Sequence, residues 1–199
     1  MTYYKYDFYK YVAPDVRGIA MPTVEDAVED VIIDFCQKTS VYRQWLEDQI
    51  SVAVDDEEVE LDLPDDTAVV EVMGIQEVDD DGEYGDFIDP DTYMFTNQGD
   101  TPKIIFSEPS EDEYDARVRV ALRPIIGFTE VPDWLWEDWR DVISEGVKAR
   151  LLSMRSMSWY SPNEAGQHMA QYLLGVHKAS RQVVLETINK VTKPVSRYI

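Results

Sequence analysis

The sequence predicts an α+β protein: a helical bundle of one N-terminal helix and two long C-terminal helices, with an inserted antiparallel β-sheet region. Three observations lead to this prediction. Apolar residues recur with helical spacing near both ends of the 199-residue chain, the spacing changes to alternation in the middle, and acidic residues concentrate there. With 44% hydrophobic residues, a chain of this length can bury one sizeable core.

The first helix is predicted from about Thr23 to Lys38. Its apolar residues share the i, i+3, i+4, i+7 spacing of one helix face; they are Val24, Ala27, Val28, Val31, Ile32 and Phe35. Residues 1–22 precede it as an aromatic arm. The arm contains five of the twelve tyrosines: Tyr3, Tyr4, Tyr6, Tyr9 and Tyr11. Two interpretations of the arm remain open, namely an extension along a neighbouring protein and an edge strand on the chain's own sheet.

Residues 51–130 are predicted to be the inserted β-region. A segment from Ser51 alternates between apolar and acidic residues, and later strand candidates are separated by Gly and Pro signals. Those candidates are residues 68–75, 93–95, 103–106 and 117–122. Together they predict an antiparallel sheet of about five strands. Residues 41–50 are ambiguous between a short helix and a strand.

Two long helices are predicted after Val131. Pro132 suits the first turn of the first helix. Ser161-Pro162-Asn163-Glu164 is a capping sequence for the second helix, which ends before Pro194. The bundle domain is therefore expected to comprise residues 23–50 and 131–193, followed by a C-terminal tail of residues 194–199.

Glycines and tryptophans predict tight packing of these helices. Four of the five tryptophans lie in or just after the first one: Trp134, Trp136, Trp139 and Trp159. A glycine inside a helix costs about 1 kcal/mol relative to alanine. Three glycines carry this cost, Gly146, Gly166 and Gly175. We therefore expect close helix approach at each of them.

The net charge of −22 comes from the middle of the chain. Residues 51–116 hold 23 of the 40 acidic residues and a single base, Lys103. Such a surface repels phosphate, which argues against binding to nucleic acid. The usual meaning of an acidic run is a solvated face.

No catalytic, cofactor-binding or metal site is predicted. The single cysteine, Cys36, excludes an internal disulfide framework and a cysteine-rich zinc site. His168 and His177 fall on opposite faces of one predicted helix. Residues 77–82 resemble the start of a calcium loop, but Ile88 occupies the twelfth position, where a bidentate glutamate is required. No phosphate-binding glycine loop, GxSxG or HExxH motif is present.

The sequence also lacks membrane signals. It has no run of eighteen apolar residues, and its aromatic N-terminus is unlike a signal sequence, so a product made in the cytoplasm is expected.

Several short segments at the ends of predicted elements occur in an order typical of one family. They are Phe35–Val41, Leu61–Pro64, Val69–Val72, Val131–Pro132, Gly146, Ala149–Met154 and Trp159-x-x-Pro162. In their order and spacing they resemble the head-to-tail adaptor (connector) proteins of short-tailed and related tailed bacteriophages. The resemblance covers about residues 20 to 190 and leaves out the tyrosine-rich N-terminus.

This resemblance implies a structural role at the neck of the virion, without enzymatic activity. Such adaptors form a ring, typically dodecameric, under the portal protein. The ring extends the DNA channel, passes DNA without binding it specifically, and offers a platform for tail or nozzle proteins. No cofactor and no membrane is implied. By position alone, residues 190–199 are the candidate portal-contacting segment.

The candidate site residues follow from this role. Candidate subunit or partner contacts are the five tyrosines of the arm, two tryptophans that lie off the predicted apolar face, and the C-terminal end: Tyr3, Tyr4, Tyr6, Tyr9, Tyr11, Trp134, Trp136, Lys193, Arg197, Tyr198 and Ile199. Candidate channel-facing acids, which would keep DNA from sticking, are Asp79, Asp80, Asp81, Glu83, Glu111, Asp112 and Glu113.

Two other functions remain open. One is another neck protein, such as a stopper or a tail terminator. The other is an acidic inhibitor that imitates DNA, with the carboxylates of residues 55–116 as a phosphate-like array. The inhibitor would compete with DNA for a DNA-binding protein, whereas an adaptor would bind a portal ring.

Overall fold

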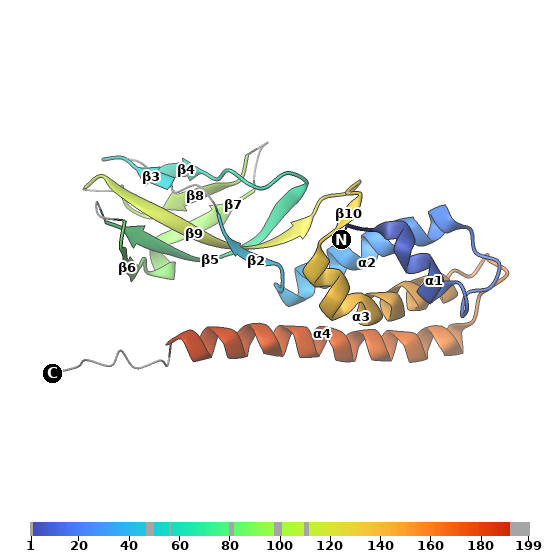
Figure 1. Cartoon of the computed structure of the whole chain (residues 1–199). Helices are drawn as coiled ribbons and strands as arrows, with labels where there is room; N and C mark the ends of the chain where they lie inside the picture. Colours follow the sequence, from blue (N-terminus) through green and yellow to red (C-terminus); the bar gives the residue numbers. More distant parts are fainter. Residues whose placement is uncertain are drawn as a thin grey trace. The chain divides into compact units, whose positions relative to one another are not determined.

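The computed structural model describes residues 2–46, 50–55, 57–79, 82–97, 101–109 and 112–191, with side chains up to 185 (Figure 1). The chain forms two compact units. Unit 1 joins Met1–Val41 to Ile125–Ile199, and unit 2 is the continuous stretch Tyr42–Pro124. The inserted β-unit thus spans 42–124, compared with the expected 51–130. Residues 43–45 and 50–52 form strands, which resolves the ambiguity at 41–50 for the described residues.

The predicted fold class, a helical bundle with a modest inserted sheet, is wrong. The described residues form four α-helices and ten strands in three separate sheets, so the chain is a mixed α and β protein with a large β-region. Several strands are only three or four residues long, among them β2 (Arg43–Trp45), β3 (Ile50–Val52), β4 (Glu58–Glu60) and β6 (Tyr84–Phe87). Strands this short are poorly revealed by alternation, which explains why the β-region was underestimated.

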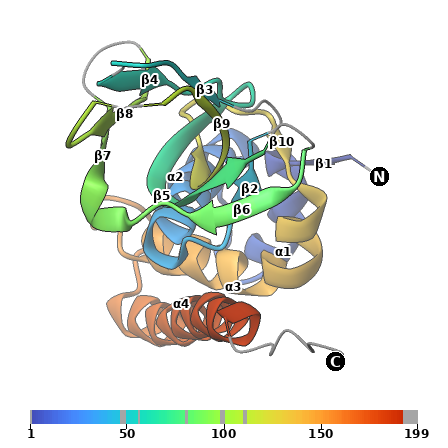
Figure 2. The ribbon, with the colours of Figure 1, turned by 90° about the vertical axis from the view of Figure 1, so that its left-hand side faces the viewer.

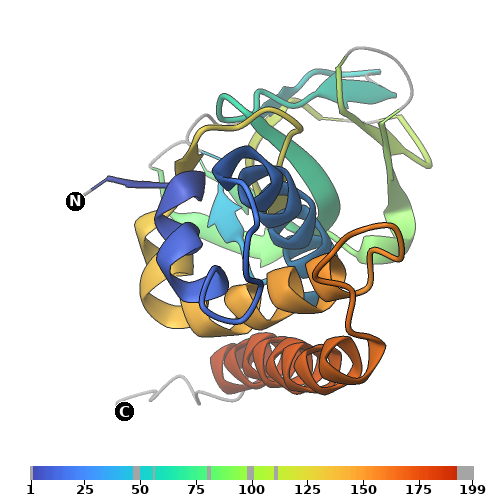
Figure 3. The same ribbon diagram turned by 90° about the vertical axis from the view of Figure 1, so that its right-hand side faces the viewer.

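Unit 1 is a group of packed helices (Figure 3). Its buried side chains are aromatic and aliphatic. Its elements are β1 (Tyr3–Tyr4), the 3₁₀ helix η1 (Lys5–Phe8), α1 (Tyr9–Val12), α2 (Met21–Thr39), β10 (Glu130–Val131), α3 (Asp133–Leu152) and α4 (Pro162–Val191). Helix α3 packs against both α2 and α4, and η1 packs against α2. The predicted aromatic arm is therefore part of the folded unit, because Phe8, Val12 and Val16 are fully buried in its core.

Helix α2 begins two residues before the predicted Thr23, because Pro22 is accommodated in its first turn. Its C-terminal end is made by polar residues. The Thr39 hydroxyl donates to the Phe35 carbonyl (2.7 Å) and accepts from the Val41 amide (3.4 Å). Ser40 adopts a left-handed conformation with φ of 48° and ends the helix. The Phe35–Val41 segment of the family resemblance is thus a helix end.

Helices α3 and α4 approach closely at two of the three glycines. A Cβ added to Gly146 would lie 2.8 Å from Val31 of α2 and 2.8 Å from Tyr172 of α4, and one added to Gly175 would overlap the Val142 side chain. Gly166 differs, since a Cβ there would meet nothing within 4 Å. The expectation of close approach is therefore confirmed for two glycines and wrong for Gly166.

Unit 2 is built from two antiparallel sheets that curl around one core (Figure 2). The larger sheet has the order β2 (Arg43–Trp45), β9 (Tyr114–Pro124), β5 (Thr67–Val78) and β6 (Tyr84–Phe87), and β3 (Ile50–Val52) also pairs with β9. The smaller sheet has the order β4 (Glu58–Glu60), β8 (Lys103–Phe106) and β7 (Tyr93–Thr96), which follows the 3₁₀ turn η2 (Pro90–Thr92).

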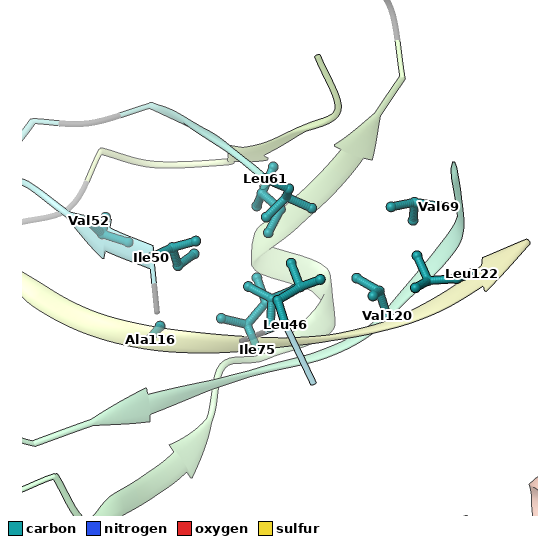
Figure 4. Close-up of a cluster of buried hydrophobic side chains, with 11 residues drawn as sticks. Leu46, Ile50, Val52, Leu61, Val69, Ile75, Ala116, Val120 and Leu122 are labelled. Carbon is teal, nitrogen blue, oxygen red and sulfur yellow. The ribbon is translucent and has the colours of Figure 1, made fainter. Parts of the chain in front are cut away.

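The core of unit 2 lies on one face of the β5–β9 ladder (Figure 4). Alternate residues of β9 supply it, and Ile75 of β5 and Ile104 of β8 are fully buried there. The buried β9 residues are Ala116, Val118, Val120 and Leu122. The intervening β9 residues consequently point to the opposite face of the larger sheet.

Candidate protein-binding surfaces

The aromatic arm covers one end of α3. Tyr3 pairs with Val131 in the two-residue ladder of β1 and β10, so the arm does form an edge strand, but with β10 rather than with the sheets of unit 2. The Tyr3 ring stacks on Trp136 at 4.6 Å, and Phe8 and Tyr11 approach the same indole edge-on. Such aromatic pairs stabilise packing beyond the area that they bury.

Trp136 is consequently buried, with 5% of its surface exposed. The expectation that it lies off the apolar face and is exposed is wrong, because the arm supplies a second apolar environment. Trp134 is half-buried. Among the tyrosines of the arm, Tyr6 is exposed, and Tyr3, Tyr4, Tyr9 and Tyr11 are half-buried. The other candidate contacts, Lys193, Arg197, Tyr198 and Ile199, lie outside the described residues.

The described members of the predicted channel-facing acids lie at one end of the larger sheet of unit 2. The register pairs Val78 with Asp115, so the β5–β6 turn and the segment before β9 lie at the same end of the ladder. Asp79 holds the turn, since its carboxylate accepts from the Glu83 amide at 2.7 Å. The four described members, Asp79, Glu83, Asp112 and Glu113, are exposed. Asp80, Asp81 and Glu111 lie outside the described residues.

The face of the larger sheet that points away from the core of unit 2 carries arginines and aromatic rings. None of these residues was predicted as a site residue. The Arg117 guanidinium lies 4.0 Å from the Trp45 ring centroid and 3.3 Å from that of Tyr84, and it donates to Gln76 Oε1 at 2.6 Å. The Phe87 ring lies 6.3 Å from Trp45. The available signal was the alternation of Arg117, Arg119, Ala121 and Arg123 with buried residues.

Among its described side chains, up to Leu185, helix α4 buries one stripe of its surface. The buried residues recur at helical spacing; they are Ala165, Tyr172, Gly175, Val176, Ala179 and Val183. Five large apolar residues of α4 are exposed, a density that other described helices do not reach. They are Met169, Leu173, Leu174, Val184 and Leu185.

The side of α4 opposite this stripe forms what we call the α4 outer face: Leu174, Lys178, Arg181 and Leu185. These residues follow one another at i, i+4, i+7 and i+11, and all four are exposed. Leu174 is 62% exposed and Leu185 is 46% exposed. No acidic residue occurs from Ala165 to Leu185, although the whole chain has a net charge of −22. The α4 outer face is therefore apolar and basic in an acidic protein.

Helix α3 has an exposed side that is acidic. We call Trp134, Glu137, Asp138 and Asp141 the α3 outer face, because they share one side of the helix at i, i+3, i+4 and i+7. The three acids are exposed. Arg140 lies beside this face, with its Nε 3.0 Å from the Asp141 carboxylate and its guanidinium 4.7 Å from the Tyr11 ring centroid.

An ion cluster links three segments of unit 1. Lys148 Nζ lies 2.8 Å from Asp15 and 3.0 Å from Glu145, and His168 Nδ1 lies 2.6 Å from the other Glu145 oxygen. Burial would raise the pKa of the Glu145 carboxyl, but the hydrogen bonds to His168 and Lys148 outweigh burial and lower that pKa. The geometry of this cluster joins α3 to α4 and to the segment before α2.

Two other buried groups have shifted pKa values. Burial raises the pKa of the Cys36 thiol to about 12, so this cysteine is protonated and unreactive at neutral pH. Burial, together with the hydrogen bond to Asp34 (2.8 Å), raises the pKa of Tyr172. Both groups lie inside unit 1 and are structural.

Two surface hollows are lined by a mixture of polar and apolar residues. One in unit 1 is lined by Pro14, Asp15, Arg17, Leu152, Ser158, Trp159 and Glu164, and one in unit 2 is lined by Ile88, Asp91, Thr92, Phe106, Ser107, Glu108 and Tyr114. Neither lining contains a histidine, cysteine or lysine. Within the described ranges, no group of three or more His, Cys, Asp or Glu side chains could hold a metal ion.

The described helices include none that is long and apolar enough to cross a membrane. No family model matches the sequence. The search of curated proteins also gives no match.

Proposed function

We propose that this protein is a virion structural protein: a head-to-tail adaptor that forms a ring under the portal of a tailed bacteriophage. The ring would extend the DNA channel and give the tail its attachment platform. Its partners would be further copies of itself, the portal protein, and tail or nozzle proteins, and it would act in the neck of the particle.

The observation that carries this proposal is the unpartnered apolar surface of α4. Exposed apolar side chains are normally scattered over a monomer, and a continuous group of them marks a surface for another protein. Helix α4 exposes five within 17 residues, from Met169 to Leu185. A chain whose main surface feature is an uncovered helix side is suited to assembly rather than to chemistry.

The segments of the family resemblance that lie in unit 1 have a shared role that supports the proposal. Residues 35–41 end α2, Gly146 allows α2 and α4 to approach α3, and Val131–Pro132 leads into α3. Trp159 closes the α3–α4 connection, since its indole N–H donates to the Leu151 carbonyl at 3.1 Å. These segments set the geometry of the helices in unit 1, which is the unit with the candidate contact surface, whereas Leu61–Pro64 and Val69–Val72 lie in unit 2.

The acidic end of unit 2 is compatible with a DNA conduit. Carboxylates repel phosphate, so a surface of this kind beside DNA would let the duplex slide without binding. The same acids could equally be a solvated surface. The proposal therefore rests on unit 1, and the acids are an accessory feature.

The test is to mix the purified full-length chain with the portal protein encoded near it, and to measure mass by light scattering and shape by negative-stain imaging. A ring that caps the portal is the expected result, whether or not the chain alone is a monomer. A chain that leaves the portal bare would contradict the adaptor role. Binding to a tail ring would then indicate a stopper or terminator, and displacement of DNA from a DNA-binding protein would indicate a mimic.

A further inference from the structure

We infer that the α4 outer face of one copy packs against the α3 outer face of the next copy. The occupant of the uncovered helix surface is thus a second copy of this chain. The inference rests on the proposed function, because it names the contact that would build the proposed ring. It assigns that contact to Leu174, Lys178, Arg181 and Leu185 on one side, and to Trp134, Glu137, Asp138 and Asp141 on the other.

Charge complementarity is the first argument. Between Ala165 and Leu185 the chain has Lys178 and Arg181 and no acid, whereas residues 133–141 have four acids and one base, Arg140. Neither Lys178 nor Arg181 forms an ion pair with a described residue, and the same holds for Glu137 and Asp138. Opposite charges without partners on two faces of one chain attract between copies and repel when like faces meet.

The apolar content of the two faces is the second argument. Leu174 and Leu185 stand on either side of the basic pair, and Trp134 is the half-buried aromatic residue of the acidic face. Burying a leucine side chain away from water favours association. Apolar side chains beside a pair of charges supply both components of a protein interface, apolar burial and polar pairing.

The levels of the two faces along the helix pair are the third argument. Helices α3 and α4 run antiparallel, with Gly146 beside Tyr172 and Gly175 beside Val142. Residues 174–185 of α4 therefore run alongside residues 133–142 of α3. Two different faces in contact make a heterologous interface, which closes into a ring when copies are related by rotation alone. Copies related by rotation alone all lie at the same height along the ring axis. Two contacting faces must then also lie at the same height, and the two outer faces do so when the helix pair is parallel to the ring axis.

Charge reversal tests the contact. The double variant Lys178→Glu, Arg181→Glu would place acids against acids, and Glu137→Lys, Asp138→Lys would place bases against bases. Each double variant alone is expected to weaken self-association, and ring formation on the portal, by about tenfold or more. An equimolar mixture of the two is expected to restore assembly, with the copies alternating, and so is the quadruple variant. All four positions are exposed, so folding is expected to be unchanged.

A second variant tests the apolar part. Leu174→Asp is expected to prevent assembly, while Met94→Asp, at a position with almost the same exposure (61%) in unit 2, is expected to leave it intact. Equal effects of the two changes would overturn the inference.

The outcomes separate this inference from the proposed function. A ring that forms on the portal and ignores both charge reversals overturns the inference and leaves the adaptor role standing. Self-association that follows the reversal and rescue pattern, without portal binding, supports the contact and contradicts the adaptor role. A chain that neither self-associates nor coats the portal overturns both.

Discussion

The two units differ most in what they present to the outside. Unit 2 carries 25 of the 40 acidic residues and five of the 18 bases, whereas unit 1, with 15 acids and 13 bases, is close to neutral. Among the described side chains, unit 1 leaves five large apolar residues of one helix exposed, whereas the exposed ones of unit 2 lie on separate segments: Val54, Tyr84 and Phe87 of β6, and Met94 of β7. Charge keeps unit 2 hydrated and apart from similar surfaces, so association is expected to depend on unit 1.

The units also differ in how their cores are filled. Unit 2 is packed by alternating aliphatic residues between two sheets, and unit 1 depends on glycines that let helix backbones approach. The first arrangement is sensitive to lost volume and the second to added volume. Substitutions in each unit should therefore distinguish the two kinds of core packing.

The largest effect is expected for Ile75→Ala in unit 2. Ile75 is fully buried, and removing its side chain leaves a cavity that costs about 2–5 kcal/mol of unfolding free energy. Urea unfolding followed by circular dichroism measures the loss. The rate of labelling of the Cys36 thiol reports the unfolding of unit 1 and serves as the internal control. If Ile75→Ala accelerates this labelling as much as it destabilises unit 2, the two units unfold as one.

Gly175→Ala is expected to destabilise unit 1 by about 1–3 kcal/mol, because the new methyl group overlaps the Val142 side chain. Faster Cys36 labelling and a lower melting temperature would report it. Gly166→Ala is the matched control on the same helix. Its methyl group meets nothing within 4 Å, so it should stabilise by up to about 1 kcal/mol. The same sign for both substitutions would refute close packing at Gly175.

Glu145→Gln is expected to cost about 1–2 kcal/mol at neutral pH, because it removes the charge that Lys148 and His168 contact. The pKa of Glu145 is lowered in the folded state, so its contribution is complete above the unfolded pKa and is lost as pH falls through the folded pKa. Thermal unfolding of both proteins should therefore differ at pH 7 and converge at pH values below about 4. A difference that persists unchanged at pH 3 would contradict this role.

The smallest effect is expected for Tyr172→Phe, at about 0.5–1.5 kcal/mol. The ring remains packed beside Gly146, and only the hydrogen bond to Asp34 is lost. Chemical unfolding of the variant measures the difference. A loss as large as that of Gly175→Ala would mean that the hydroxyl, rather than ring packing, holds α4 in place.

The sequence by itself determined the three long helices of unit 1 and the position of the β-region between the first and the second of them. The apolar spacing from Val24 to Phe35, and prolines at 132 and 162, identified α2, α3 and α4 to within a few residues, because helical periodicity and first-turn proline are local signals. The acidic character of residues 51–116 and the single cysteine were likewise read directly from the sequence.

Only the tertiary structure decided the size of the β-region, the burial of Trp136 and the identity of the exposed helix surface. Three-residue strands acquire their pairing from β8 and β9, which are distant in sequence, and Trp136 is buried by an arm more than 120 residues away. Leu174 and Tyr172 are both apolar and two positions apart, yet one is exposed and the other buried. Helical spacing indicates much of the buried side of α4, but its exact limits depend on packing between helices, which separates Tyr172 from Leu174.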